Sequence, residues 1–159
     1  MSEQVRQSRP LKQIASLLAV VQIEDVRLVE SSAKSNVRST DEAGTVKLTI
    51  QTSTSVKEYS DDSLFVLAGI SAQLVPTESE QSPAITLRAT FELRYSLPKD
   101  FKVSRRQLNT FARINGAFNA WPYWREFIQN TVARMDLPPI TLPVFRLEDA
   151  VRTKKKKPA

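Results

Sequence analysis

The sequence predicts an α+β fold in which a four-stranded antiparallel sheet is followed by a short and a long helix. Between residues 19 and 97, four segments have the alternation or the β-branched composition of strands, and the loops between them are too short for crossover helices. Clear helical spacing of apolar residues begins only after residue 104. Strands and helices are therefore segregated along the chain, as in α+β proteins.

The N-terminal part of the chain leads into the first predicted strand. Residues 1–10 are polar, and we expect them to be flexible. Residues 11–18 carry apolar side chains at helical spacing, but the pattern is too short to decide whether they form a helix. Residues 19–29 are rich in β-branched side chains and are predicted to form a strand. The polar residues 31–44, which end in a glycine, are predicted to form a loop.

Three further strands are predicted. Residues 45–57 alternate strictly between apolar or threonine positions and polar positions, so this strand has one wet face. Residues 64–75 alternate in part and end at a proline. Residues 85–97 show the clearest alternation of the chain and also end at a proline. Because the strands follow in succession, we expect a meander-like antiparallel sheet with one face toward solvent.

Two helices are predicted after the sheet. Ser104 and Gln107 form a capping-box pattern at the start of the first helix, and the pair Asn115-Gly116 is interpreted as its end. The second helix is predicted to begin near Trp121, with Pro122 at the first helical position, and to run to about Met135.

Aromatic residues are concentrated in the second half of the chain. Eight of the 12 aromatic residues lie between Phe101 and Phe145, more than one helix over a four-stranded sheet needs for its core. This surplus predicts a subunit interface, an exposed apolar groove, or both. The apolar residues 140–147 are expected to be extended, and Pro143 excludes a central strand there. Within it, the segment from Leu142 to Phe145 is interpreted as a groove wall, a lid or plain packing.

The composition excludes several classes of active site. The 159 residues include no cysteine and no histidine, which removes thiolate metal sites, imidazole ligands and every triad that depends on imidazole. Three glycines are too few for a glycine-rich phosphate loop. The composition leaves a binding or scaffolding protein, or an enzyme that relies on carboxylates, lysines or hydroxyls alone. The enzyme is the weakest of the hypotheses, and we expect no catalytic residue, metal or cofactor.

The positive charge of the chain is concentrated at its C-terminus. The net charge is +6, from 23 basic and 17 acidic residues. Without Arg152 and the four lysines 154–157, the balance is 18 against 17, or +1. We expect a single domain over residues 11–150 and a disordered basic tail over residues 151–159. The tail is interpreted either as a solubilising end or as a hook for nucleic acid, anionic lipid or an acidic partner.

Membrane insertion is not expected from the sequence. No stretch approaches the roughly 20 apolar residues of a membrane span. The apolar run 17–21 is too short for a signal-peptide core, so we expect a cytoplasmic protein.

The region from Asn119 to Phe145 resembles the signature region of the SecB family of export chaperones. The resemblance rests on the run WPYWRE, residues 121–126, which matches the family's aromatic-Pro-Tyr-x-Arg-Glu helix start. It continues through the helix stop at Leu137-Pro138 and the extended segment LPVF, residues 142–145. About 27 residues carry the specific part, and four preceding strands match the family's order.

The resemblance implies a SecB-like fold and an ATP-independent holdase that keeps client polypeptides unfolded. It also implies a homotetramer, built as a dimer of dimers, whose apolar grooves accept extended client segments. Groove candidates are the large apolar residues of this region: Phe101, Phe111, Phe118, Trp121, Trp124, Phe127, Leu142, Val144 and Phe145. Candidates for the motif helix and its interfaces are Pro122, Tyr123, Arg125, Glu126, Ile128 and Val132, among which Arg125 and Glu126 resemble an ion or cap pair.

Departures from the family pattern define the remaining hypotheses. Fourteen residues follow Phe145, too few for the second long helix through which family members engage the export motor SecA. Binding to SecA through a second C-terminal helix, as in other family members, is therefore in doubt. A subgroup of SecB-like proteins instead holds an aggregation-prone antitoxin, and a short, basic member fits that subgroup at least as well as general export. A third hypothesis is an adaptor that binds nucleic acid or an acidic partner through the lysine tail.

Overall fold

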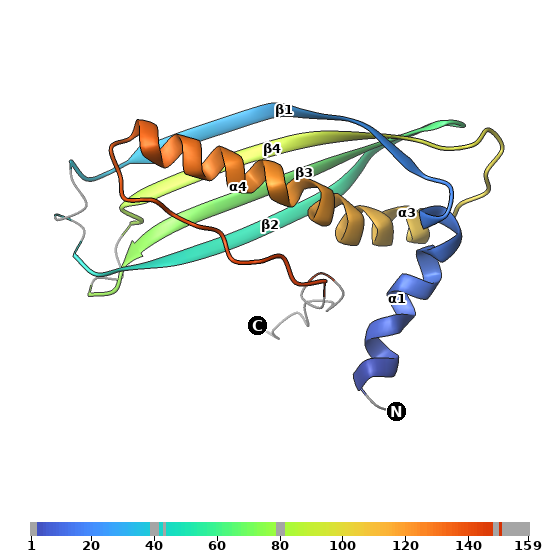
Figure 1. Cartoon of the computed structure of the whole chain (residues 1–159), viewed down its shortest axis with the longest axis horizontal. Coiled ribbons are helices and arrows are strands. Elements are labelled where there is room, and N and C mark those ends of the chain that lie inside the picture. Colours follow the sequence, from blue (N-terminus) through green and yellow to red (C-terminus); the bar gives the residue numbers. More distant parts are fainter. Residues whose placement is uncertain (1–2, 39–41, 43, 79–81, 148–149, 151–159) are drawn as a thin grey trace.

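The computed structural model describes residues 3–38, 42, 44–78, 82–147 and 150 and confirms the predicted α+β architecture. Four antiparallel strands form one twisted sheet in the order β1-β4-β3-β2 (Figure 1). The strands are β1 (Gln22–Ser35), β2 (Val46–Tyr59), β3 (Ser63–Pro76) and β4 (Ile85–Ser96). The predicted basic tail, residues 151–159, lies outside the described residues, so its disorder stays a prediction.

The strand order corrects the predicted meander. Strands β2, β3 and β4 follow one another as neighbours, but β1 pairs with β4, from Gln22 opposite Ser96 to Ser35 opposite Ile85. The short turn at 60–62 holds β2 and β3 together, whereas the longer connection 36–45 lets the chain pass to the other edge of the sheet. Local alternation does not specify which strands are neighbours, and therefore the sequence could not show this crossing.

The first strand is also longer than predicted. The polar residues 31–35, assigned to a loop from their composition, continue β1 and pair with residues 85–89 of β4. Pairing with a strongly alternating partner strand outweighs the weak strand propensity of serine and lysine in this stretch. Two register shifts, at Ile23/Asp25 and at Leu28/Glu30, interrupt β1 as β-bulges.

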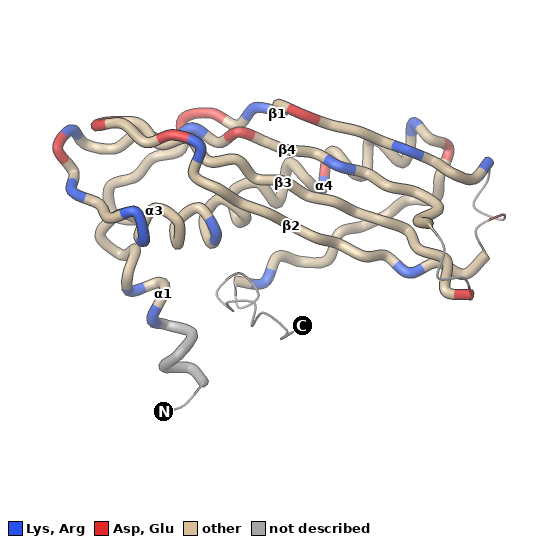
Figure 2. The backbone as a smooth tube through the Cα atoms, turned by 180° about the vertical axis from the view of Figure 1, so that it is seen from behind, with Lys and Arg blue, Asp and Glu red and all other residues tan. Residues whose placement is uncertain are grey.

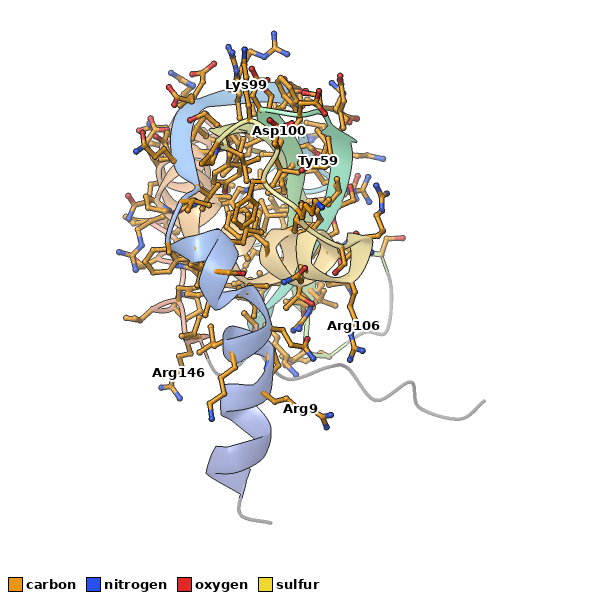
Figure 3. All side chains as sticks on the ribbon, turned by 90° about the vertical axis from the view of Figure 1, so that its right-hand side faces the viewer. Arg9, Tyr59, Lys99, Asp100, Arg106 and Arg146 are labelled. Atoms are coloured by element: carbon orange, nitrogen blue, oxygen red, sulfur yellow. The ribbon has the colours of Figure 1, made fainter. Side chains whose placement is uncertain are left out.

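Residues 11–18 are helical. They belong to α1 (Glu3–Leu18), which begins within the segment that the sequence predicts to be flexible. The side chains of Ile14 and Leu17 are fully buried, and Gln107 Nε2 donates to the carbonyl oxygen of Gln13 at 3.0 Å. The first part of α1, which includes Arg9, projects from the layer of sheet and helices (Figure 3).

The helices after the sheet form one continuous rod, which corrects the predicted break. The rod consists of α3 (Arg105–Phe111), the π-helical turn η1 (Ala112–Gly116) and α4 (Ala117–Arg134). The capping box is confirmed: Gln107 N donates to Ser104 Oγ at 3.2 Å, and Ser104 N donates to Gln107 Oε1 at 2.9 Å. The rod ends where predicted, because Asp136 takes a left-handed φ of 57°.

Gly116 and Pro122 do not have the roles that the sequence suggests. Gly116 is helical, with φ −58°, and a Cβ placed on it would lie 3.0 Å from Val66 Cγ1. Glycine is therefore needed here for close contact between helix and sheet rather than for a helix end. Pro122 lies inside α4, not at its first position.

The helical rod covers one face of the sheet, and the core lies between them. Inward side chains of β3 and β4, such as Leu64, Val66 and Leu87, pack against Phe111, Ile114 and other residues of the rod. The opposite face is open and carries charged positions of both signs along the strands (Figure 2). Among the described residues, no helix has the length and apolar character that crossing a membrane requires.

Candidate functional site

Several predicted site residues belong to the core of the single chain. Phe111 and Trp124 are completely buried, and Leu142 is 1% exposed. On α4, Ile128 and Val132 are buried with Trp124, four and eight residues further along the same helical face. These side chains hold the rod against the sheet, and in this structure they have no surface for a client.

An aromatic patch is formed by the exposed Phe118 together with the half-buried Trp121 and Phe145. Phe118 is 56% exposed, and its ring centroid lies 5.8 Å from that of Phe145 in an edge contact. Trp121 lies 5.4 Å from Phe145 and 5.9 Å from the buried Trp124. The structure therefore brings together three of the predicted groove residues, which are separated by up to 27 positions in the chain, and anchors them on the core.

The segment after α4 completes this patch. Residues 138–146, here called the C-terminal strap, have no regular secondary structure and run back along α4 (Figure 1). Trp121 Nε1 donates to the carbonyl oxygen of Pro143 at 3.1 Å, and Arg125 Nη2 donates to that of Leu142 at 3.3 Å. Val144 points outward and is 75% exposed. The strap is thus an extended apolar peptide held by side-chain donors of a helix.

Two predicted groove residues lie elsewhere. Phe101 is half-buried in the loop between β4 and α3, where its carbonyl accepts a hydrogen bond from Tyr59 Oη at 3.2 Å. Phe127 is half-buried against the core on α4. Neither ring makes an aromatic contact with the patch within the described residues.

The remaining motif residues have separate roles on α4. Arg125 and Glu126 do not pair: Arg125 binds the strap, and Glu126 accepts a hydrogen bond from Asn130 Nδ2 at 2.5 Å. Tyr123 is 42% exposed and lies 5.7 Å from Phe91 of β4, measured between ring centroids. Pro122 is exposed.

The open face of the sheet has a charged centre that the sequence did not reveal. The carboxylate of Glu92 is 8% exposed and binds Arg27 of β1 at 2.7 Å and Lys57 of β2. The hydrogen bond from Lys57 lowers the pKa of Glu92 despite its partial burial, and Arg27 adds to this shift. The partners lie 65 and 35 positions away in the sequence, so only the sheet order brings them together.

Two further polar groups are perturbed by burial beneath the rod. Burial raises the pKa of Tyr95 to about 12, although Asn119 Nδ2 donates to its hydroxyl at 3.0 Å. Burial also lowers the pKa of Arg113, which donates to the carbonyl oxygen of Ala150. With its pKa raised, Tyr95 stays neutral at pH 7, and the contacts of Tyr95 with Asn119 and of Arg113 with Ala150 hold the helical rod in place.

The described residues offer little for a metal or a small cofactor. They include no group of three or more acidic, histidine or cysteine residues that could hold a metal ion. A shallow hollow of about 420 Å³ lies over Gly69 on the open face, lined by polar side chains that include Ser53, Arg88 and Thr90. The hollow is open to solvent and lined mainly by polar and charged side chains, so it lacks the apolar enclosure typical of cofactor sites.

A second exposed apolar region lies on the edge strand β1. Ile23, Leu28 and Val29 are 47%, 44% and 43% exposed, and within the described part of the chain β1 is an edge strand with no neighbour on its outer side. Unpaired edges with apolar side chains favour association with another strand.

Comparison with known proteins identifies the fold. No family model and no curated protein sequence matches the chain. The solved structure of the SecB-like chaperone Rv1957 of Mycobacterium tuberculosis, in complex with a ChAD peptide from the Rv1956 HigA1 antitoxin, matches with a TM-score of 0.72. The match covers 87% of this chain and 98% of that chain at 22% sequence identity. A protein of unknown function from Streptococcus agalactiae matches with a TM-score of 0.48, at 12% identity over 78% of this chain and 97% of that one.

Proposed function

We propose that this chain, which has the fold of a SecB-like chaperone, is a non-enzymatic holdase that binds extended apolar segments of unfolded polypeptides without nucleotide. The observation that carries this proposal is the partly exposed aromatic patch of Phe118, Trp121 and Phe145 beside side-chain donors that bind backbone carbonyls. Apolar burial is non-directional, and backbone carbonyls are common to all sequences. The combination therefore suits clients of many sequences.

An antitoxin segment is the client class that we favour. The structurally similar SecB-like chaperone was solved with a peptide from an antitoxin, and its chain is covered almost completely by the match. Export clients remain the second candidate, supported by the resemblance of residues 121–126 to the export family. A dedicated antitoxin chaperone is expected to bind one client at least tenfold more tightly than unrelated unfolded proteins.

We further propose that the active form is a homotetramer, a dimer of dimers. The exposed apolar residues Ile23, Leu28 and Val29 on the unpaired edge of β1 support self-association. Pairing of two such edges would bury both the apolar side chains and the free backbone groups. A larger assembly also places several aromatic patches on one particle, so a long unfolded client gains avidity.

The first experiment measures aggregation. A chemically unfolded protein is diluted into buffer with and without this chain, in the absence of nucleotide, and light scattering is followed. We expect suppression at near-stoichiometric amounts and its loss in the variant Phe118→Ser, which removes an exposed ring from the patch. Gln129→Ala changes an exposed residue of the same helix outside the patch and the motif, and serves as the matched control. Unchanged scattering with several different clients would exclude a general holdase.

A further inference from the structure

The strap has the properties of a bound client. It is extended, it carries the apolar sequence ITLPVF over residues 140–145, and it lies along α4 (Figure 1). Its contacts are of two kinds: backbone carbonyls receive hydrogen bonds from α4, and apolar side chains enter the space beside the helix. Leu142 is 1% exposed, and the Phe145 ring packs on Phe118 and Trp121.

The donors on the helical rod follow a consistent order. Arg125 binds the carbonyl of Leu142 and Trp121 binds that of Pro143. The higher position on the helix thus meets the lower position on the peptide, so the two run antiparallel. Both donors bind backbone carbonyls, which every residue of an extended chain carries.

The site also has donor capacity that the strap does not use. Among the described residues, Arg125 Nε is buried and has no acceptor. Arg125 already donates through Nη2 to the strap, so its second donor lies beside the same peptide. Buried donors without partners are uncommon in folded proteins. A peptide that placed one more carbonyl here would satisfy a group that the strap leaves unpaired.

We propose that α4 carries a binding site for an extended polypeptide and that the chain's own residues 140–146 occupy it until a client replaces them. The client segment has an aliphatic residue at the position of Leu142, an aromatic residue three positions later and no charge between them. This inference rests on the proposed holdase function and adds the location, direction and regulation of the site. Under this inference, the strap is an occupant of the groove and not one of its walls.

Competition by the strap determines the measured affinity. A segment tethered next to its site acts at an effective concentration in the millimolar range. The site is therefore open for only a small fraction of the time, and the apparent affinity for a client is reduced by that fraction. Weakening the strap should then tighten client binding, whereas a change on the helix side weakens strap and client alike and largely cancels in the apparent affinity.

The test uses a labelled peptide with the strap's own sequence, PPITLPVFR, residues 138–146, added to the full-length chain. Fluorescence anisotropy gives its dissociation constant. We expect Phe145→Ala, which weakens the strap without emptying a fully buried position, to bind the probe about tenfold more tightly than the unmodified chain. Trp121→Phe, which keeps a ring but removes the donor to Pro143, weakens the strap and the probe alike, so its apparent dissociation constant should change by less than about twofold. Thr141→Ala, at an exposed strap position, is the matched control.

Release of the strap can be observed directly. Because the chain has no cysteine, Thr141→Cys provides a single site on the strap for an environment-sensitive dye. Binding of reduced, alkylated α-lactalbumin, a permanently unfolded protein, should change the emission of this dye. The same dye at Ser55→Cys, an exposed position on β2, should not respond.

The outcomes separate this inference from the proposed function. If the unmodified chain suppresses aggregation but Phe145→Ala binds the probe more weakly, the strap is a wall of the groove and the inference is wrong. Client binding without a change at Thr141→Cys leads to the same conclusion. If neither the unmodified chain nor Phe145→Ala binds the probe or α-lactalbumin, the holdase function itself is wrong.

Discussion

Glu92 shows how one side chain connects three strands. Its carboxylate binds Arg27 of β1 and Lys57 of β2 across the open face, and these contacts lower its pKa below 4.5. A group whose pKa is lower in the folded than in the unfolded chain stabilises the fold above the unfolded value. This contribution is lost as the pH falls from about 4.5 through the folded pKa of Glu92.

Glu92→Gln is therefore expected to make the free energy of unfolding depend less on pH in the acidic range. At pH 7 the variant should lose about 1 kcal/mol, because both cations are substantially exposed and solvent screens the pair. Between pH 6 and pH 3 its free energy of unfolding should fall less than that of the unmodified chain. Urea denaturation at both pH values measures the difference. Glu58→Gln is the control, since Glu58 is exposed and forms no ion pair with the described residues. Parallel pH profiles for Glu92→Gln and the unmodified chain would contradict this assignment.

Two glycines provide a matched test of close packing. A Cβ at Gly116 would lie 3.0 Å from Cγ1 of the fully buried Val66, whereas a Cβ at Gly69 would lie 2.8 Å from the Ser53 hydroxyl. The hydroxyl can rotate away, but the buried valine cannot. Gly116→Ala should therefore lose about 1–2 kcal/mol by overpacking even though alanine favours a helix. Gly69→Ala should change stability by less than about 0.5 kcal/mol. Urea midpoints compare the two, and a stabilised Gly116→Ala would show that the helix moves freely over the sheet.

At the scale of elements, the sequence predicted whether a segment is a helix or a strand better than it predicted where the segment begins and ends. The four strands and the capping box at Ser104 depend on local patterns, and all of them are present in the structure. The break at Asn115-Gly116 is absent because Gly116 packs on Val66, a residue 50 positions earlier. The extension of β1 through residues 31–35 likewise depends on β4. Errors occurred where a distant segment determined the local conformation.

The aromatic stripe of α4 could be predicted, but not which rings are exposed. Trp121 and Trp124 are three positions apart and share one helical face, yet Trp124 is completely buried while Trp121 remains partly exposed. The strap determines which of the two rings is exposed, because it returns along α4 and places Phe145 on Trp121. Periodicity describes one helix alone, so it contains no information about a later segment that packs on that helix.

This division gives a prediction for α4. Trp124→Ala should lower the free energy of unfolding by about 3–5 kcal/mol, because it empties a buried position. Phe118→Ala, at an exposed position of the same helix, should change it by less than about 1 kcal/mol. Thermal or urea unfolding measures both. If both variants lost the same free energy of unfolding, the Phe118 ring would have to be buried in the functional form, as it would be at a subunit interface.

For the whole molecule, the exposed edge of β1 is the most direct test of assembly. The double variant Ile23→Lys and Leu28→Lys places charges on that edge, and we expect its mass in solution to fall below that of the unmodified chain. Light scattering coupled to size-exclusion chromatography measures the mass. Ser32→Lys adds a charge to an exposed polar position of the same strand and is the control. A monomeric unmodified chain would rule out the proposed tetramer.

The pairing of β1 with β4 also determines the order in which the chain acquires its structure. Strands β2, β3 and β4 form hairpins between neighbours in sequence, but Gln22 must meet Ser96, 74 positions later. Closing so long a loop costs conformational entropy before any contact compensates for it, so β1 is expected to dock after the folding barrier has been crossed. Val26→Ala in β1 should then speed unfolding while leaving the refolding rate almost unchanged, whereas Val66→Ala in β3 should slow refolding. Stopped-flow measurements in urea separate the two rates. During synthesis, the first strand of this chain must remain without its partner until the last one has been made.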